Sequence, residues 1–326
     1  MEAGIVFDAH RDIVYEVPVE QRSLMEHLFS FDLHLDQMEA GGIDAEIFAI
    51  CTAAESLRIS PAAEALREID AFQRELEANK LRVVLATTAR QVREAKERGL
   101  IAGLLGLEGA EPLEGEVGLL RTFYQLGVRN LGITWSLRNA AADGVDEHGS
   151  GGGLTKFGVS LVKEANRIGM LVDVAHLSPR GLEDVLNVTE RPIIDSHTAA
   201  ETLVRHRRNR SDRELEAIAK GGGVIGVVTV PGYLSSGGSK ATLEVLLDHV
   251  DHIVSVAGID HVGFGADFDA WHSHHTPLVE PWVEGLEDAT QWSRLDNGLR
   301  NRGYSDADVR KLMGENFMRV LEQVLG

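Results

Sequence analysis

Histidine and carboxylate side chains follow several apolar runs of this 326-residue sequence, in a pattern that could hold metal ions. They are His10 and Asp12 after IVFDA, Glu108 after IAGLLGL, His176 after MLVDVA, His197 after PIIDS and Asp267 after HVGFGA. Side chains two residues apart on a strand point the same way, so His10 and Asp12 could reach one ion together. Imidazoles and carboxylates without thiolates favour zinc, manganese, iron or cobalt over calcium or a structural cysteine–zinc site.

Each of these residues taken alone has an ordinary structural explanation. A His-x-Asp pair often arises by chance, and an Asp or Glu at the end of a strand commonly caps a helix or contacts a loop. His176 could be a core histidine whose hydrogen bonds are satisfied. The combination is harder to explain this way, because five strands would each need an independent structural reason. We therefore interpret the set as a metal site.

The elements that must position these side chains are nine short apolar runs, predicted as strands. Their ranges are 4–10, 43–50, 82–87, 101–109, 129–135, 170–176, 191–197, 222–230 and 260–269. Between them lie stretches in which apolar residues recur at intervals of three and four residues, a pattern typical of helices; one example is PAAEALREIDAFQRELEANK (61–80). Buried parallel strands alternating with helices indicate an α/β fold, and we expect a (β/α)8 TIM barrel. Its active site would lie at the C-terminal ends of the strands.

A barrel needs eight strands, so one of the nine runs must be accessory or wrongly assigned. The glycine-rich pieces at 149–153 and 235–239 are short loops, and no internal repeat or low-complexity segment is visible. We therefore expect residues 1–326 to form a single metallohydrolase domain.

Composition excludes several classes of partner. The net charge of −19 repels phosphate backbones and anionic lipid, so neither nucleic acid nor a membrane surface is an expected partner. Cys51 is the only cysteine, which rules out an intrachain disulfide and a thiolate metal cluster and suits a reducing compartment. The N-terminus shows no signal-peptide pattern, and no run is long and apolar enough to span a membrane, so we expect a cytoplasmic protein.

Other chemistries are poorly supported. Cys51 lies in a predicted strand away from any obvious base, so a thiol nucleophile is not indicated. The glycine-rich segments lack the spacing of phosphate-binding loops, which argues against a nucleotide cofactor.

At the same residues the sequence resembles the membrane dipeptidase (renal dipeptidase) family of binuclear zinc peptidases, within the amidohydrolase-like barrels. The longest matching block is GLTKFGVSLVKEANRIGMLVDVAHLS (153–178), followed by RPIIDSHTAA (191–200). Further matches in family order are DAHRD (8–12), GGIDAEIFAI (41–50), GLLGLEGAEPL (103–113), RRNRSDRELEAIAKGGGVIGVV (207–228), GIDHVGFGADFD (258–269) and GENFMRVLEQV (314–324).

The resemblance implies two divalent metal ions, with zinc favoured. It assigns His10, Asp12 and Glu108 to one ion, and Glu108, His176 and His197 to the other. Glu108 and a water or hydroxide would bridge them, and a shared carboxylate offsets the repulsion between two cations about 3.5 Å apart.

Two further residues acquire roles from the resemblance. Asp267 matches the family's acid/base residue, although a carboxylate that only orients a ligand is the alternative; Asp269 is expected to be loop structure. Arg208 matches the residue that grips the C-terminal carboxylate of a dipeptide, which a guanidinium can bind bidentately. Its neighbours Arg205, Arg207 and Arg210 could simply be a basic loop that balances an acidic surface.

One position departs from the family. Where the family commonly has Leu-Thr-His, this chain reads ITW, so Trp135 replaces a histidine that helps to polarise the scissile carbonyl. Tryptophan can donate one hydrogen bond but cannot carry charge. We expect Trp135 to contact the substrate and alter its range, with ordinary packing at the barrel mouth as the alternative. The cluster WHSHH (271–275) is expected to be a loop or substrate lid and not a metal site.

The predicted function is a metal-dependent dipeptidase that uses a metal-bridged hydroxide on a small-molecule substrate. The C-terminal residue of the substrate could have the D configuration, as in this family. The first alternative is a barrel hydrolase for another amide, an N-acyl amino acid or a lactone. The second is a non-catalytic, metal-dependent binding protein, against which the presence of Asp267 beside all five ligands argues. Family members often pair as homodimers, so a homodimer is also an expectation.

Overall fold

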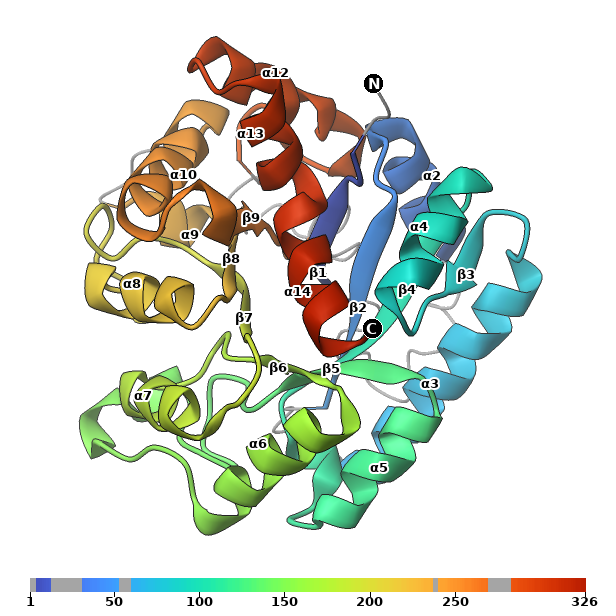
Figure 1. Cartoon of the computed structure of the whole chain (residues 1–326), viewed down its shortest axis with the longest axis vertical. Coiled ribbons are helices and arrows are strands. Elements are labelled where there is room, and N and C mark those ends of the chain that lie inside the picture. The colour runs from blue at the N-terminus through green and yellow to red at the C-terminus, as the bar shows by residue number, and fades with distance from the viewer. Residues whose placement is uncertain (1–3, 13–30, 53–59, 237–239, 269–282) are drawn as a thin grey trace.

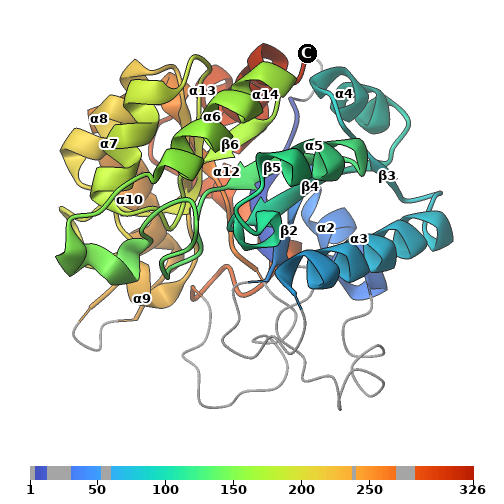
Figure 2. The ribbon, with the colours of Figure 1, turned by 90° about the horizontal axis from the view of Figure 1, so that it is seen from below.

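The strands form a nearly closed parallel barrel with helices around it (Figures 1 and 2). The computed structural model describes residues 4–12, 31–52, 60–236, 240–268 and 283–326. Within these ranges the strands around the barrel are, in order, β1 (Phe7–Asp12), β2 (Ala45–Cys51), β4 (Ile101–Glu108), β5 (Val128–Gly132), β6 (Leu171–Asp173), β7 (Ile194–Thr198), β8 (Val224–Val227) and β9 (Val262–Phe264). The predicted (β/α)8 barrel is confirmed.

The accessory strand is the run predicted at 82–87. It forms β3 (Val83–Leu85), which pairs with β4 outside the barrel path. Its apolar pattern is the same as that of a barrel strand because it also packs in the core, at Val83.

Helices cover the outside of the barrel. The longer ones are α2 (Phe31–Gly41), α3 (Pro61–Ala78), α4 (Ala89–Glu97), α5 (Val117–Gln125), α6 (Lys156–Ile168), α7 (Pro179–Val188), α8 (Asp212–Lys220), α10 (Leu243–Ala257), α12 (Ser293–Asn301) and α14 (Asn316–Val324). Shorter helical segments are α9 (Pro231–Leu234), α13 (Asp306–Arg310), η2 (Glu111–Leu113), η3 (Val145–Ser150), η4 (Ile259–His261), η5 (Ala289–Gln291) and η6 (Lys311–Glu315).

Hydroxyl caps start two helices just after loops that carry candidate site residues. Ser178 accepts a hydrogen bond from the N–H of Gly181 at the start of α7, which also has proline in its first turn. Ser211 and Glu214 form a reciprocal capping box at the start of α8. These caps fix where the preceding loops must end.

Several strands are shorter than predicted. β6 ends at Asp173, β9 at Phe264 and β5 at Gly132, so His176, Asp267 and Trp135 all lie beyond the strand ends. After β6 the chain turns, and the N–H of Leu177 donates to the carbonyl of Val174. An apolar run can continue through such a buried turn, which is why the sequence pattern overestimated the strands.

The seam between β9 and β1 closes at the C-terminal ends of these strands. The carboxylate of Asp8 accepts the N–H of Ala266 at 2.7 Å, and the N–H of Asp267 donates to the carbonyl of His10 at 3.1 Å. A parallel bridge joins Arg11 to Phe268. The first and last strands are therefore connected beside the candidate site.

Two glycines allow the backbones to pack closely near His197. A Cβ atom at either Gly226 or Gly265 would lie 1.9 Å from the carbonyl oxygen of Ser196. Such a contact is far inside van der Waals distance, so any larger residue would push β8 or β9 away from β7.

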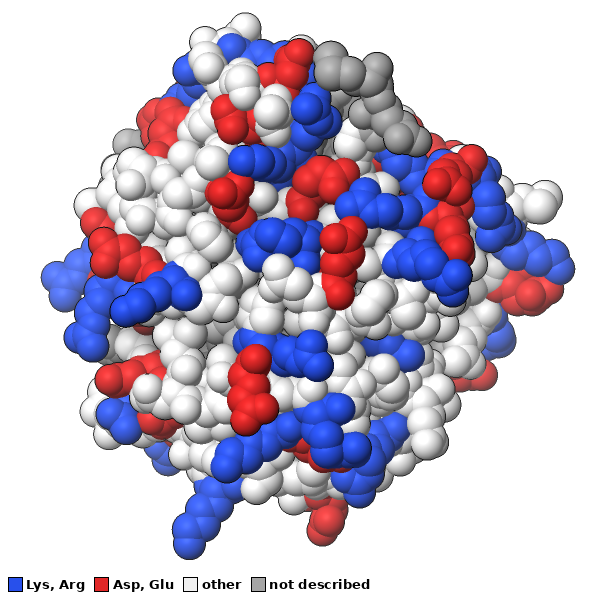
Figure 3. All heavy atoms as spheres, viewed as in Figure 1, with Lys and Arg blue, Asp and Glu red and all other residues white. Residues whose placement is uncertain are grey.

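Helix α14 closes the N-terminal end of the barrel, where it crosses the centre of the view in Figure 1. Phe317 of this helix is fully buried and stacks on Phe7 of β1, with ring centroids 5.4 Å apart. Figure 3 shows basic and acidic side chains intermixed on this face. Arg93 of α4 pairs with Glu315 and with Glu322 of α14. No helix in the described residues is long and apolar enough to cross a membrane.

We predict that Phe317→Ala destabilises the protein by about 3–5 kcal/mol, because it removes a buried aromatic ring and leaves a cavity. Urea denaturation measures the change. Leu81→Ala is the control, because Leu81 is 87% exposed and its truncation should cost no more than about 0.5 kcal/mol. Equal effects of the two substitutions would contradict the role assigned to α14.

Candidate metal centre

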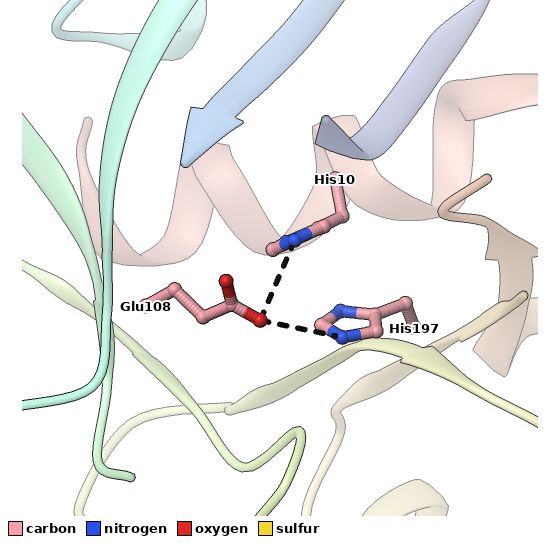
Figure 4. A group of neighbouring side chains, drawn as sticks. All are labelled: His10, Glu108 and His197. Carbon is pink, nitrogen blue, oxygen red and sulfur yellow. Dashed lines mark ion pairs between the residues drawn. The ribbon is translucent and has the colours of Figure 1, made fainter. Parts of the chain in front are cut away.

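The five predicted ligands lie together at the C-terminal end of the barrel. His10 and Asp12 come from β1, Glu108 is the last residue of β4, His197 lies in β7 and His176 lies in the turn after β6. Glu108 Oε1 is 3.0 Å from His176 Nε2, 3.7 Å from His10 Nε2 and 3.8 Å from His197 Nε2. Figure 4 shows His10, from β1, and His197, from β7, pointing at this carboxylate. One oxygen of Glu108 thus faces three imidazoles.

A second group forms on the other side of His10. Its Nε2 lies 3.7 Å from Asp12 Oδ1 and 3.6 Å from Asp267 Oδ1. Ligand atoms of His10, Asp12 and Asp267 are close enough to hold one cation, and so are those of His10, Glu108 and His197. Asp267 therefore lies beside His10 and Asp12, two of the predicted ligands.

Serine hydroxyls orient the two remaining histidines. Ser136 Oγ is 2.9 Å from His176 Nδ1, and Ser196 Oγ is 2.8 Å from His197 Nδ1. The two Nε2 atoms lie 2.9 Å apart. When each Nδ1–H donates to its serine, both Nε2 atoms present lone pairs to each other and to Glu108. A metal-binding histidine commonly has its other ring nitrogen held in this way.

The site lowers the pKa values of two histidines and raises those of Glu108 and His10. Burial lowers the pKa values of His176 and His197 well below the usual range, so both rings are neutral at pH 7. Burial raises the pKa of Glu108 to about 8. Burial alone would lower the pKa of His10, but Glu108, Asp12 and Asp267 outweigh it and raise the pKa to about 10.

This donor set fits divalent cations. His10 Nε2 and Asp12 Oδ1 are buried and make no hydrogen bond within the described residues. Buried carboxylates and facing imidazole nitrogens are costly unless positive charge lies between them. Two shared cations would satisfy all five side chains.

Two residues of the site have a strained backbone. His176 and Asp267 both have φ of +63°, in the left-handed region that residues other than glycine rarely adopt. Such conformations persist only where the surrounding structure holds them, and they gather at functional sites.

Arg208 lies beside the histidines and is 2% exposed. Its Nη2 donates to the carbonyl of His197 at 3.0 Å, whereas its Nε and Nη1 are buried without a hydrogen bond in the described structure. The guanidinium carbon is 5.6 Å from the ring centre of Tyr233, and that ring stacks on His206. Tyr233 was not predicted, because only the fold brings α9 against this arginine.

The interpretation of the arginine-rich segment as a surface loop is wrong for Arg210. Arg205 and Arg207 are exposed, and Arg207 pairs with Asp146 at 2.8 Å. Arg210 is 2% exposed and pairs with buried Asp195 at 2.7 Å. The sequence could not separate these residues because their spacing carries no helical or strand period.

Trp135 and Cys51 both lie next to predicted ligands. The Trp135 ring is half-buried and stacks on His176, with centroids 6.0 Å apart.

Cys51 is in register with Glu108, and its thiol hydrogen-bonds to that carboxylate. Cys51 is therefore not distant from acid–base groups, contrary to the sequence-based expectation. Asp269 and the 271–275 cluster lie outside the described residues.

Comparison with known proteins decides the family. The model of the membrane dipeptidase family (peptidase family M19) matches residues 1–325. This chain belongs to the membrane dipeptidase family. The predicted family is confirmed, and with it a metal-dependent dipeptidase activity.

Two curated dipeptidases are similar to this chain in sequence. Dipeptidase tcpJ of Claviceps purpurea (strain 20.1) is 33% identical over 296 residues, which cover 89% of this chain and 68% of the relative. Dipeptidase verJ of Clonostachys rogersoniana is 34% identical over 278 residues, which cover 85% of this chain and 68% of that relative.

Solved structures agree in fold. A metallo peptidase from Rhodobacter sphaeroides, liganded with a phosphinate mimic of the dipeptide L-Ala-D-Ala, is 26% identical with a TM-score of 0.86, covering 99% of this chain and 100% of that one. An amidohydrolase from Pseudomonas aeruginosa is also 26% identical, with a TM-score of 0.84 and coverage of 99% and 97%.

We predict that metal uptake by this chain releases protons at pH 7. A histidine with a pKa near 10 is protonated at pH 7 and must lose that proton to bind a cation, so the apparent metal affinity rises from pH 6 to pH 9. Calorimetric zinc titration in two buffers with different ionisation enthalpies measures the protons released.

His10→Asn should abolish the proton release attributed to this residue. His252→Gln is the control, because His252 pairs with Asp212 on the helical surface. Heats that do not depend on the buffer in the unaltered protein would contradict this prediction.

Proposed function

We propose that this chain hydrolyses dipeptides at a binuclear zinc centre held by His10, Asp12, Glu108, His176 and His197. In this proposal Glu108 bridges the two ions, Asp267 is the acid/base residue and Arg208 binds the C-terminal carboxylate of the substrate. The membrane dipeptidase family supports the metal dependence, and the geometry supports the division of roles.

The observation that carries the proposal is the position of Glu108. Its Oε1 lies within 4 Å of all three histidine Nε2 atoms. The Nε2 atoms of His176 and His197 lie 2.9 Å apart, and His10 Nε2 lies 3.7 Å from Asp12 Oδ1 and 3.6 Å from Asp267 Oδ1. A single carboxylate between two donor groups is the arrangement that a bridging ligand requires.

The chemistry divides between the ions and the side chains. Bound ions would supply Lewis acidity, which polarises a carbonyl and lowers the pKa of water into the neutral range. Asp267 would accept the proton of the attacking water and return it to the leaving nitrogen. The Asp267 carboxyl is 19% exposed, so it can meet a substrate that enters from the barrel mouth.

Arg208 supports a substrate with a free carboxylate. Its Nε and Nη1 are buried beside His197, and a carboxylate is the anion that a guanidinium fork binds in two places. The Rhodobacter sphaeroides relative binds a mimic of L-Ala-D-Ala, which supports a D residue at the C-terminal position of the substrate. Zinc as the native metal, a homodimer and a cytoplasmic location stay predictions from the sequence.

The test is hydrolysis of L,L- and L,D-dipeptides by the zinc-reconstituted protein and by Asp267→Asn. We expect hydrolysis by the unaltered chain and a loss of kcat of about 100-fold or more in the variant, with two zinc ions retained in both. Two bound metals without hydrolysis of any dipeptide would overturn the proposal. Activity confined to an N-acyl amino acid or lactone would favour another barrel hydrolase, and no activity at all would favour a binding protein.

Trp135 is the residue at which this site differs from the family pattern. Its ring stacks on His176 and leaves one N–H as the only polar group at a position where the family has histidine. Loss of one donor to the developing oxyanion typically costs about 100- to 1000-fold in kcat. The broad ring also narrows the site beside His176, so both rate and substrate size should depend on this residue.

We predict that Trp135→His raises kcat on small dipeptides by about tenfold or more and changes the order of preference among larger ones. Trp135→Phe keeps the aromatic wall but lacks the N–H, so it should lower kcat without changing that order. Steady-state kinetics over the dipeptide panel measure both effects. If neither variant alters relative kcat or KM, Trp135 serves packing alone. Activity of Trp135→His with an inert parent would refute the dipeptidase assignment.

A further inference from the structure

Arg210 makes a buried set of contacts that the proposed reaction does not use. Its Nε donates to Asp195 Oδ2 at 2.7 Å, its Nη1 donates to the carbonyl of Leu177 at 2.9 Å, and its Nη2 donates to the carbonyl of Val174. Glu214 lies 3.5 Å away on the solvent side. All three nitrogens of one guanidinium therefore act on different parts of the barrel mouth.

Two of these contacts bracket His176. Val174 and Leu177 are the ends of the turn in which His176 adopts its left-handed backbone. The Val174 carbonyl accepts the Leu177 N–H at 3.1 Å and also accepts the Arg210 Nη2–H, because a carbonyl oxygen has two lone pairs. The guanidinium holds the two carbonyls from one point, so it fixes the turn that aims the His176 ring at Glu108.

The third contact reaches the strand of His197. Asp195 lies two residues before His197 on β7 and is fully buried. Its Oδ2 accepts the Arg210 Nε–H, which fixes β7 against the same turn. A single side chain thus contacts both the turn that carries His176 and the strand that carries His197, whose Nε2 atoms lie 2.9 Å apart.

The backbone of Arg210 also connects this clamp to Arg208. The Arg210 N–H donates to the carbonyl of Ala199 at 2.9 Å, and Thr198 Oγ1 donates to the carbonyl of Arg208 at 2.9 Å. The segment that carries Arg208 is therefore bonded along the end of β7. A displacement of Arg210 would move the Arg208 guanidinium as well as the histidines.

We propose that Arg210 is a positioning residue that sets the metal-binding pair His176 and His197 and the carboxylate anchor Arg208 as one unit. The part of this inference that concerns Arg208 rests on the proposed dipeptidase reaction. The histidine part rests on the metal site alone. Lysine cannot replace Arg210, because an ammonium lacks the planar fork that reaches Asp195 and two carbonyls in fixed directions.

The variants separate positioning from simple loss of folding. Arg210→Lys keeps the charge and loses the fork. Removing Arg210 alone would leave Asp195 as an unpaired buried charge, so Asp195→Leu with Arg210→Met removes the pair together, a replacement that buried ion pairs often tolerate. Arg205→Met is the matched control, because Arg205 is exposed in the same loop. Arg208→Met shows the effect of losing the anchor itself.

Two measurements test the inference, one for the positions of the two histidines and one for the position of Arg208. Zinc affinity, from competition with a chromophoric chelator, reports the histidine pair without any need for activity. The ratio of kcat/KM for a dipeptide to that for its C-terminal amide reports the anchor. A variant that merely folds less well lowers both rates together and leaves their ratio unchanged, and its melting temperature in the metal-free state shows the loss of folding directly.

We expect Arg210→Lys and the double variant to weaken zinc binding about tenfold or more and to lose the preference for the free carboxylate. Arg208→Met should lose only the preference, and Arg205→Met should change neither quantity. Unchanged zinc affinity and unchanged preference in both Arg210 variants would overturn the inference. If the parent protein hydrolyses no dipeptide, the proposed function fails, while zinc affinity still decides whether Arg210 positions the histidines.

Discussion

The central constraint on this structure is a group of largely buried carboxylates whose negative charge must be neutralised. Glu108, Asp12 and Asp267 converge on His10 in a setting where most of these atoms have lost contact with water. Carboxylates this close repel each other and are expensive to bury. Without cations the site favours protons, because burial raises the pKa of Glu108 and the neighbouring carboxylates raise the pKa of His10. Divalent ions are the alternative that removes both the repulsion and the protons.

The barrel makes this concentration of charge possible by joining elements that are distant in sequence. The first strand closes against the last through Asp8 and Ala266, which places Asp267 beside His10. Gly226 and Gly265 let the backbone approach the Ser196 carbonyl closely next to His197. Helix α14 seals the opposite end with apolar packing around Phe317. The polar candidate site thus lies at one end of the barrel, and the apolar packing of α14 lies at the other.

The sequence predicted the barrel and which polar side chains would meet at its mouth, because both leave local signals. Apolar runs mark the strands, and a polar residue at the end of a run marks the mouth. The same signals could not identify β3 as accessory, since a strand packed outside the barrel is as apolar as one within it. They also overextended β6, because the turn before His176 is buried. Arg210, Tyr233 and the contact of Cys51 with Glu108 depend on long-range pairing, which no local pattern records.

The left-handed backbones of His176 and Asp267 bear on how this protein can change over time. Each conformation costs about 1–3 kcal/mol for a residue with a side chain, and glycine would relieve that cost. The most accessible stabilising substitutions at these two positions are therefore ones that delete a ring or a carboxylate from the centre. Selection for stability alone would therefore erode the site at these two positions.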